Sequence, residues 1–192
     1  MEALLVSAGV VAFAELGDKT QLLAILLATR FRAPFPIIMG ILCATALNHT
    51  LAAWLGTYIG DWVGDNLSWI LALSFFAMGL WTLLPDKLEG QPRVFDGYGA
   101  FAATLMSFFL VEMGDKTQLA TMALGARFHS IAIVALGTTL GMMIADVPAV
   151  YVGEFVATRI PLKLMRLIAA AFFLLLALLA ALDWGRRFLV AG

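Results

Sequence analysis

The sequence has little charge and almost no cysteine. Only 13% of its 192 residues are Asp, Glu, Lys or Arg, and 62% are hydrophobic, whereas a soluble globular chain is about a quarter charged and about half apolar. The excess of apolar side chains indicates contact with a lipid bilayer. A net charge of −1 without any run of basic residues argues against a nucleic-acid partner. The single cysteine, Cys43, cannot form an intrachain disulfide.

The N-terminal apolar stretch lacks the features of a cleavable signal peptide. Its only charged residue before Glu15 is Glu2, so a basic n-region is missing. The apolar run also continues directly into the charged segment that begins at Glu15. We therefore expect this stretch to be retained as the first helix of the protein.

Six segments are long and apolar enough to cross a bilayer, which takes about 20 mostly apolar residues per helix. Short stretches with Pro, Gly or charged residues separate them. The predicted fold is all-α and integral to the membrane, with six transmembrane helices and no soluble domain. The predicted spans are residues 3–29, 35–59, 67–84, 98–125, 130–153 and 162–183.

The chain repeats itself with an offset of 97 residues. The segment Glu15-Leu-Gly-Asp-Lys-Thr-Gln21 recurs as Glu112-Met-Gly-Asp-Lys-Thr-Gln118, and the same offset aligns Gly40 with Gly137. Each copy holds three predicted spans, and because three is odd, the second copy must enter the membrane from the opposite side. Such inverted-topology repeats are typical of secondary transporters, which bind their substrates near the midplane. The predicted division is repeat 1 at 1–84, a connector at 85–97 and repeat 2 at 98–192.

Lysine and arginine are unequally distributed between the two sets of predicted loops. Seven lie on one side and three on the other, and the side with more is usually cytoplasmic. We therefore predict that both termini lie outside and that the 85–97 loop is cytoplasmic. The seven are Arg30, Arg32, Lys87, Arg93, Arg159, Lys163 and Arg166, and the three are Arg127, Arg186 and Arg187.

The repeated motif places two carboxylates and a lysine in the middle of the first and fourth predicted spans. An ionised side chain there costs at least about 2.5–3.5 kcal/mol, and such groups are functional by default. Glu15 and Asp18 are three residues apart, so they are expected to share one helix face, as are Glu112 and Asp115. We predict that these four carboxylates bind a metal ion. The supporting positions are Lys19, Thr20, Gln21, Lys116, Thr117 and Gln118.

Two features of the motif bear on its local structure. Each Glu is followed four residues later by a Lys, so Glu15–Lys19 and Glu112–Lys116 pairs within one helix are an alternative to an ion site, although they leave both aspartates unexplained. The glycine of each motif allows either a close helix crossing or local unwinding, which would free carbonyl groups for an ion.

The charge of the motifs suggests cation/proton exchange. Four carboxylates and two lysines leave a charge of −2, which one divalent cation or two protons would neutralise. A site that accepts either, but not both, exchanges one for the other. Oxygen ligands favour Ca²⁺, Mn²⁺ or Mg²⁺, whereas zinc and copper prefer His and Cys. We expect a divalent metal ion and protons as partners, and no bound cofactor.

Three further polar residues lie deep in the predicted spans. Asn48 and His49 lie in the second span and Asp146 in the fifth, and the 97-residue offset aligns His49 with Asp146. For Asp146 we favour a role as a proton relay or as a partner behind the metal ligands. For Asn48 and His49, an interhelical hydrogen bond is as reasonable as such a role.

Two copies of E-x-G-D-K-[ST] in a six-span protein resemble one family of manganese and calcium transporters. Its eukaryotic members act in the Golgi and its bacterial members export manganese, within the second calcium/cation antiporter superfamily. The resemblance covers nearly the whole chain and implies divalent cation/proton exchange, with manganese as the leading ion and a bacterial inner membrane as the location. The motif positions are Glu15, Gly17, Asp18, Lys19 and Thr20, and Glu112, Gly114, Asp115, Lys116 and Thr117.

Other functions fit the sequence less well. A Ca²⁺/H⁺ antiporter stays open, because Ca²⁺ and Mn²⁺ accept the same oxygen ligands. A small-solute exporter has no need of four clustered acids. An intramembrane metal-dependent enzyme would be expected to carry an H-E-x-x-H pattern or an activated Ser or Cys nucleophile, so we predict that the protein is not an enzyme. A structural subunit gives no reason to duplicate buried charge. No pattern specifies an oligomeric state.

Overall fold

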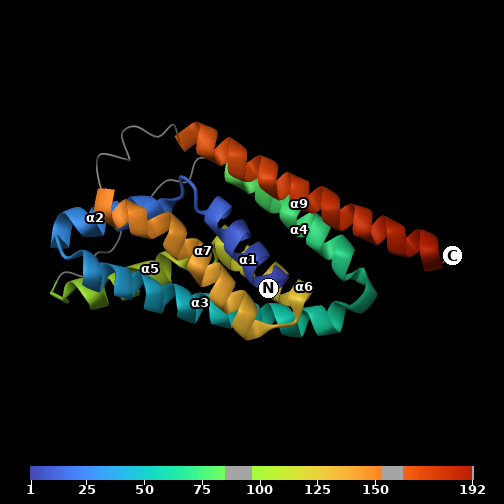
Figure 1. Ribbon diagram of the computed structural model, residues 1–192, viewed down its shortest axis with the longest axis horizontal. Helices are drawn as coiled ribbons and strands as arrows, with labels where there is room; N and C mark the ends of the chain where they lie inside the picture. The colour runs from blue at the N-terminus through green and yellow to red at the C-terminus, as the bar shows by residue number, and fades with distance from the viewer. Residues whose placement is uncertain (85–96, 153–161, 192) are drawn as a thin grey trace.

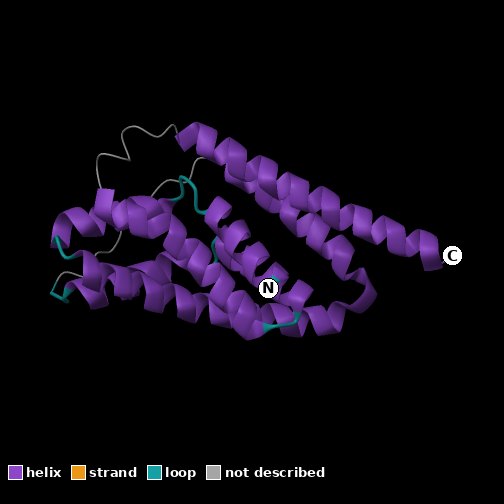
Figure 2. Cartoon of the chain, in the orientation of Figure 1, coloured by secondary structure: helices purple, strands orange, loops and turns teal. Residues whose placement is uncertain are grey.

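The protein is helical throughout residues 1–84, 97–152 and 162–191, which are the residues that the computed structural model describes (Figures 1 and 2). Within 1–84 and within 97–152, short turns join successive helices. The predicted 85–97 connector and the basic residues Lys87, Arg93 and Arg159 lie, apart from Gly97, outside the described residues. The helices are α1 Glu2–Ala14, α2 Lys19–Phe31, α3 Pro34–Val63, the 3₁₀ turn η1 Gly64–Asn66, α4 Leu67–Leu83, α5 Ala100–Glu112, α6 Lys116–Phe128, α7 Ile131–Val152 and α9 Leu162–Ala191.

The first and fourth predicted spans are not continuous helices, and the prediction was wrong on this point. The span predicted at 3–29 is divided into α1 and α2, and that at 98–125 into α5 and α6. In the middle of each break, Gly17 and Gly114 have φ values of 76° and 80°. Glycine adopts this left-handed conformation without the steric cost that a Cβ atom brings. The motif glycines therefore interrupt both helices at the same point.

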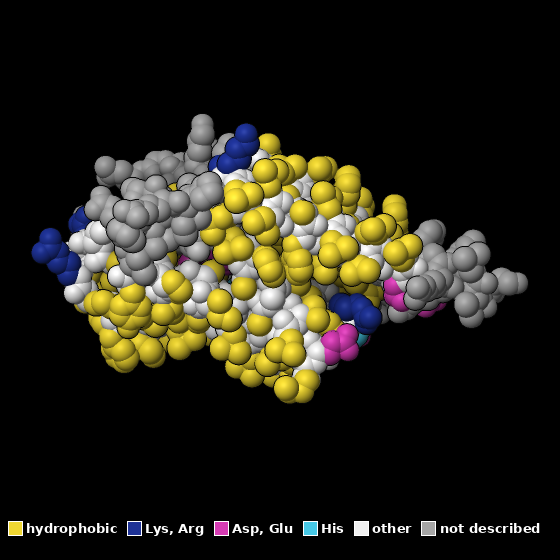
Figure 3. All heavy atoms as spheres, turned by 45° about the horizontal axis from the view of Figure 1, so that its top comes forward, with side chains coloured by type: hydrophobic (Ala, Val, Ile, Leu, Met, Phe, Trp, Pro, Cys, Tyr) yellow, Lys and Arg dark blue, Asp and Glu magenta, His cyan; other side chains and the backbone are white. Residues whose placement is uncertain are grey.

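The surface of the described residues is that of a membrane protein. Three helical stretches are long and apolar enough to cross a bilayer, namely Pro34–Leu83, Ile131–Tyr151 and Lys163–Asp183. Large apolar side chains cover much of the face seen in Figure 3, and only a few Lys and Arg side chains interrupt it, at the left edge, at the top and at the lower right. The protein is therefore integral to the membrane. The arrangement of six spans stays a prediction, because α1 and α5 are shorter apolar helices.

The two long helices α3 and α7 form the centre of the bundle and contact each other. Helix α3 also packs against α5 and α6, and α7 packs against α1 and α2, while α4 and α9 lie together along one side (Figure 1). Glycines allow close approach at equivalent points. A Cβ atom on Gly40 would lie 2.7 Å from Thr104 Cβ, and one on Gly137 would lie 2.8 Å from Ser7 Cβ. Since these two contacts differ by 97 in both residue numbers, corresponding residues of the two halves pack in corresponding ways.

Candidate ion-binding site

The two helix breaks meet in the interior of the protein. Glu15 follows the end of α1 and Asp18 precedes α2, whereas Glu112 ends α5 and Asp115 precedes α6. All four side chains are buried. The expectation that each Glu shares a helix face with its Asp is wrong, because the two residues lie on opposite sides of a break. The breaks nevertheless bring the acidic residues of both motifs to one region.

The motif glutamines hold the two breaks in shape. Gln21 Oε1 accepts a hydrogen bond from the Gly17 N–H at 2.9 Å, and Gln118 Oε1 accepts one from the Gly114 N–H at 2.7 Å. In this way each glutamine satisfies a backbone donor that the interrupted helix leaves without its usual partner. Both glutamines therefore position the motif, and their predicted role as nearby neutral oxygens of the site stays a prediction.

The motif threonines orient the glutamates. The Thr20 hydroxyl donates to Glu15 Oε2, and the Thr117 hydroxyl donates to Glu112 Oε1. The second oxygen of each glutamate, Glu15 Oε1 and Glu112 Oε2, is buried and has no hydrogen-bond partner among the described residues. Buried polar atoms are usually paired, so both oxygens are placed to accept a further group.

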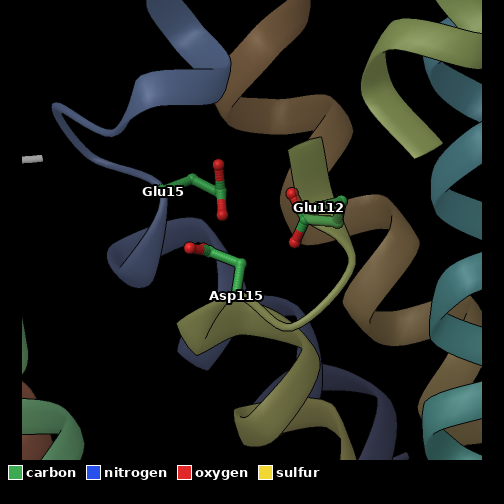
Figure 4. A group of neighbouring side chains, drawn as sticks. All are labelled: Glu15, Glu112 and Asp115. Atoms are coloured by element: carbon green, nitrogen blue, oxygen red, sulfur yellow. The ribbon is translucent and has the colours of Figure 1, made fainter. Parts of the chain in front are cut away.

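Three of the four predicted metal ligands come together. One carboxylate oxygen from each of Glu15, Glu112 and Asp115 lies within 4.8 Å of the other two. Figure 4 shows the three side chains extending from the two breaks toward a common space. Three carboxylates at this separation repel one another unless a positive charge lies between or beside them. Their arrangement is suited to one hard cation or to protons.

The two lysines form ion pairs across the repeats. Lys19 Nζ lies 2.6 Å from Asp115 Oδ1, and Lys116 Nζ pairs with Asp18 Oδ1. The alternative of Glu–Lys pairs within one helix is therefore wrong, since the break separates each Glu from its own Lys. Lys116 is almost completely buried, and Lys19 is about a quarter exposed. The fourth predicted ligand, Asp18, thus lies in an ion pair and outside the group of three carboxylates.

The three remaining predicted residues are all buried but differ in their contacts. Asn48 Nδ2 donates to the Phe109 carbonyl at 3.1 Å, which joins α3 to α5 by an interhelical hydrogen bond. In the part of the chain that the structure describes, neither nitrogen of His49 and neither oxygen of Asp146 has a hydrogen-bond partner.

One contact of the site could not be found from the sequence. Gln21 Nε2 donates to the backbone carbonyl of Ala145 at 3.2 Å, which ties the start of α2 to the middle of α7. Every residue has a backbone carbonyl, so the residue type does not indicate which carbonyl accepts such a hydrogen bond. The proximity of Ala145 to the polar Asp146 was the only available hint.

Comparison with known proteins gives the same family across both halves of the chain. The model of the divalent cation/proton antiporter GDT1 matches residues 3–90 and 100–187. A protein of Vibrio cholerae named "Putative manganese exporter" is 49% identical over 183 residues, which covers 94% of this chain and 91% of that protein. A GDT1-like protein of Synechocystis is 31% identical over 189 residues, covering 86% and 90% of the two chains.

A plant protein is similar at lower identity. GDT1-like protein 3 of Arabidopsis thaliana is 26% identical over 201 residues, covering 90% of this chain and 68% of that protein. No solved structure matches this chain. The family match includes both motifs and both helix breaks, and it agrees with a buried site of oxygen ligands. The chain therefore belongs to the GDT1 family of divalent cation/proton antiporters.

Proposed function

We propose that the protein exports Mn²⁺ across a bacterial inner membrane in exchange for protons. The observation that carries this proposal is the meeting of the two motifs in the interior, with oxygens of Glu15, Glu112 and Asp115 close enough to bind one ion. The choice of manganese is supported by the name of the Vibrio cholerae protein, to which the chain is 49% identical. The ligand set agrees, because Mn²⁺ favours carboxylate oxygens.

The proposed membrane arrangement is two inverted repeats, 1–84 and 98–192, with three spans each. In this arrangement α1 and α2 together form one interrupted span, and α5 and α6 form its counterpart. Two observations support it: equivalent contacts recur at an offset of 97, and the two family matches are separated by the same offset. Interrupted helices that meet near the midplane are typical of secondary transporters. The bias of Lys and Arg in the loops favours both termini outside and a cytoplasmic 85–97 loop.

The geometry suggests how exchange takes place. The ion pairs of Lys19 and Lys116 compensate Asp115 and Asp18, and they hold the two breaks against each other. Glu15 and Glu112 have no such cationic partner among the described residues, and each keeps one oxygen without a hydrogen bond. These oxygens require a metal ion or protons. Since both cannot occupy the same carboxylates, loading from one side with metal and from the other with protons gives antiport.

Ca²⁺ is the second candidate substrate. Ca²⁺ takes six to eight oxygen ligands in flexible geometry, and the described ligands contain no nitrogen or sulfur that would select against it. The family description names divalent cations without choosing among them. Competition between the two ions therefore belongs in the same experiment.

The test is transport into liposomes that contain the purified full-length protein and have an acidic lumen. We expect Mn²⁺ to enter while protons leave, faster than Ca²⁺ or Mg²⁺. Asp18→Asn and Asp115→Asn should each abolish transport while the protein remains folded, because each breaks one of the two ion pairs. Asp61→Asn is the control, since this carboxylate is 69% exposed. Near-normal transport by either variant in the site would exclude the proposed role of the motifs.

A further inference from the structure

An open pocket lies between four helices, away from the two motifs. Its volume is about 350 Å³, and residues of α1, α4, α6 and α9 line it. The α4/α9 pair forms one side of this pocket, and α1 and α6 form the other. None of its described lining residues belongs to either motif, so the pocket is separate from the candidate ion-binding site.

The polar lining residues lie at one end of the pocket, where all four helices begin or end. Glu2 is the first residue of α1, Ser68 lies in the first turn of α4, and Arg127 lies in the last turn of α6. Asp183 closes the apolar stretch Lys163–Asp183 of α9. Charged residues at the ends of apolar helices lie at the membrane surface. The mouth of the pocket is therefore at the membrane–water interface.

The rest of the pocket is apolar and extends inward from this mouth. In α1, α4 and α9 the apolar lining residues are three or four, and seven or eight, positions from the polar residue of the same helix, so they lie on the same helix face. With a rise of 1.5 Å per residue, eight positions correspond to about 12 Å. The apolar residues in question are Val6, Val10, Leu71, Phe75, Leu176 and Leu179.

This combination suits the acyl chain of a lipid better than a passing ion. A water molecule in a cavity needs two to four polar partners, and apolar cavities stay dry. A hydrated cation that entered the apolar part would lose its water without gaining other ligands. An acyl chain needs no such partners, and the bilayer around the protein supplies it.

The charges at the mouth are complementary to a zwitterionic head group. The guanidinium of Arg127 lies 5.8 Å from the centroid of the Phe128 ring, and arginine binds phosphate with two parallel hydrogen bonds. Asp183 Oδ2 accepts a hydrogen bond from the Ser68 hydroxyl at 3.0 Å, which positions this carboxylate at the mouth. The exposed Glu2 is a second carboxylate there. An anionic head group would therefore meet more negative than positive charge among the described lining residues.

We propose that this pocket binds a phospholipid with a primary ammonium in its head group, of the phosphatidylethanolamine class. Arg127 binds the phosphate, Asp183 accepts from the ammonium, and one acyl chain lies between the four helices. The lipid comes from the leaflet at the start of α1, and it joins the α4/α9 pair to α1 and α6. The site is additional to the proposed transport function and does not depend on which ion the protein carries.

The test is lipid binding to the purified, delipidated full-length protein in detergent, measured by native mass spectrometry and thermal unfolding. Phosphatidylethanolamine, phosphatidylcholine and phosphatidylglycerol with the same acyl chains are added separately. We expect phosphatidylethanolamine to bind most tightly and to raise the melting temperature most. Arg127→Gln should weaken its binding by about tenfold, because a hydrogen bond to a charged group is lost. Asp183→Asn should remove the preference over phosphatidylcholine, whose quaternary ammonium has no N–H to donate.

Two matched controls come from the same chain. Arg30→Gln changes the exposed arginine that the 97-residue offset aligns with Arg127, and Asp61→Asn changes an exposed aspartate that does not line the pocket. Both should bind phosphatidylethanolamine like wild type. The inference is wrong if phosphatidylglycerol binds more tightly than phosphatidylethanolamine. It is also wrong if Arg127→Gln binds like wild type, or if Arg30→Gln weakens binding as much as Arg127→Gln does.

A variant of the apolar part distinguishes a lipid site from an ion passage. Ala180→Phe places a ring in the pocket, so it should reduce binding of phosphatidylethanolamine while Mn²⁺ transport by the reconstituted protein continues. Blocked transport together with unchanged lipid binding would identify the pocket as an ion passage and overturn the inference. If the larger side chain prevents folding, the two variants at the mouth still decide the question, because their side chains lie at the surface end of the pocket.

Discussion

Replacing Glu112 by Gln should stabilise the metal-free protein and prevent Mn²⁺ from stabilising it further. An oxygen of Glu112 lies within 4.8 Å of one from Glu15 and one from Asp115. At an effective dielectric constant of about 20, two unit charges at that distance repel by about 3.5 kcal/mol. Lys19 pairs with Asp115, so the main relief comes from Glu15. Gln keeps the shape of the side chain and an oxygen that accepts from the Thr117 hydroxyl.

The size of the effect depends on pH in a defined direction. The repulsion exists only when both glutamates are ionised, so the gain in stability of Glu112→Gln should be largest at high pH, up to about 3.5 kcal/mol. It should approach zero at low pH, where protons already neutralise the carboxylates. The sign follows because the variant lacks a repulsion that destabilises the wild type only when both glutamates are charged.

Thermal unfolding in nanodiscs at pH 5 and pH 8, with chelator or with Mn²⁺, measures both effects. Glu2→Gln is the control, because Glu2 is exposed at the start of α1. The reasoning would be refuted if Glu112→Gln were less stable than wild type at pH 8 without metal and if Mn²⁺ stabilised both proteins equally. That result would mean that the three carboxylates do not share one space in the folded protein.

Three further outcomes are expected. In intact cells, an impermeant reagent should label a cysteine introduced at Glu2 but not one introduced at Gln91, since the proposed topology places the termini outside and the 85–97 loop in the cytoplasm. Labelling at position 91 but not at position 2 would overturn this topology. The Mn²⁺ affinity of the purified protein should fall as pH drops, and Mn²⁺ binding should release protons. Calorimetry in two buffers of different ionisation enthalpy measures both effects. An affinity that stays constant from about pH 6 to 8, without proton release, would exclude antiport at this site. Gly114→Ala should destabilise the protein by about 1–2 kcal/mol because of the positive φ of this residue. Gly114→Asn should be less harmful, since Asn tolerates that conformation. A Cβ atom at this position would meet no neighbouring residue, so the cost comes from the local backbone conformation, and equal stability of the two variants would contradict the observed break.

The sequence predicted the helical class, the duplication and the buried acids, because apolar composition and a motif repeated with an offset of 97 residues are visible in the residue types. It did not predict the interruption of the first and fourth spans. Hydrophobicity indicates whether a segment lies in the membrane, but it does not indicate whether the helix there is continuous. Gly17 was therefore compatible with either a close helix crossing or a break in the helix. The partners in the two ion pairs could not be predicted from the sequence either. Spacing along the chain makes Lys19 a neighbour of Glu15, whereas the break turns Lys19 toward Asp115 of the other half.

The ion pairs Lys19–Asp115 and Lys116–Asp18, which join the two halves of the chain, have a consequence for membrane insertion during synthesis. Asp18 and Lys19 lie in the first half of the chain, and their partners Lys116 and Asp115 lie in the second, which is synthesised later. In the proposed arrangement of spans, a first half without the second would leave these two residues in the membrane without their partners, at roughly 2.5–3.5 kcal/mol for each charged residue at the centre of a span. Arrival of the second half relieves this cost for both residues at once. The pairs between the halves thus stabilise the complete protein relative to its first half alone.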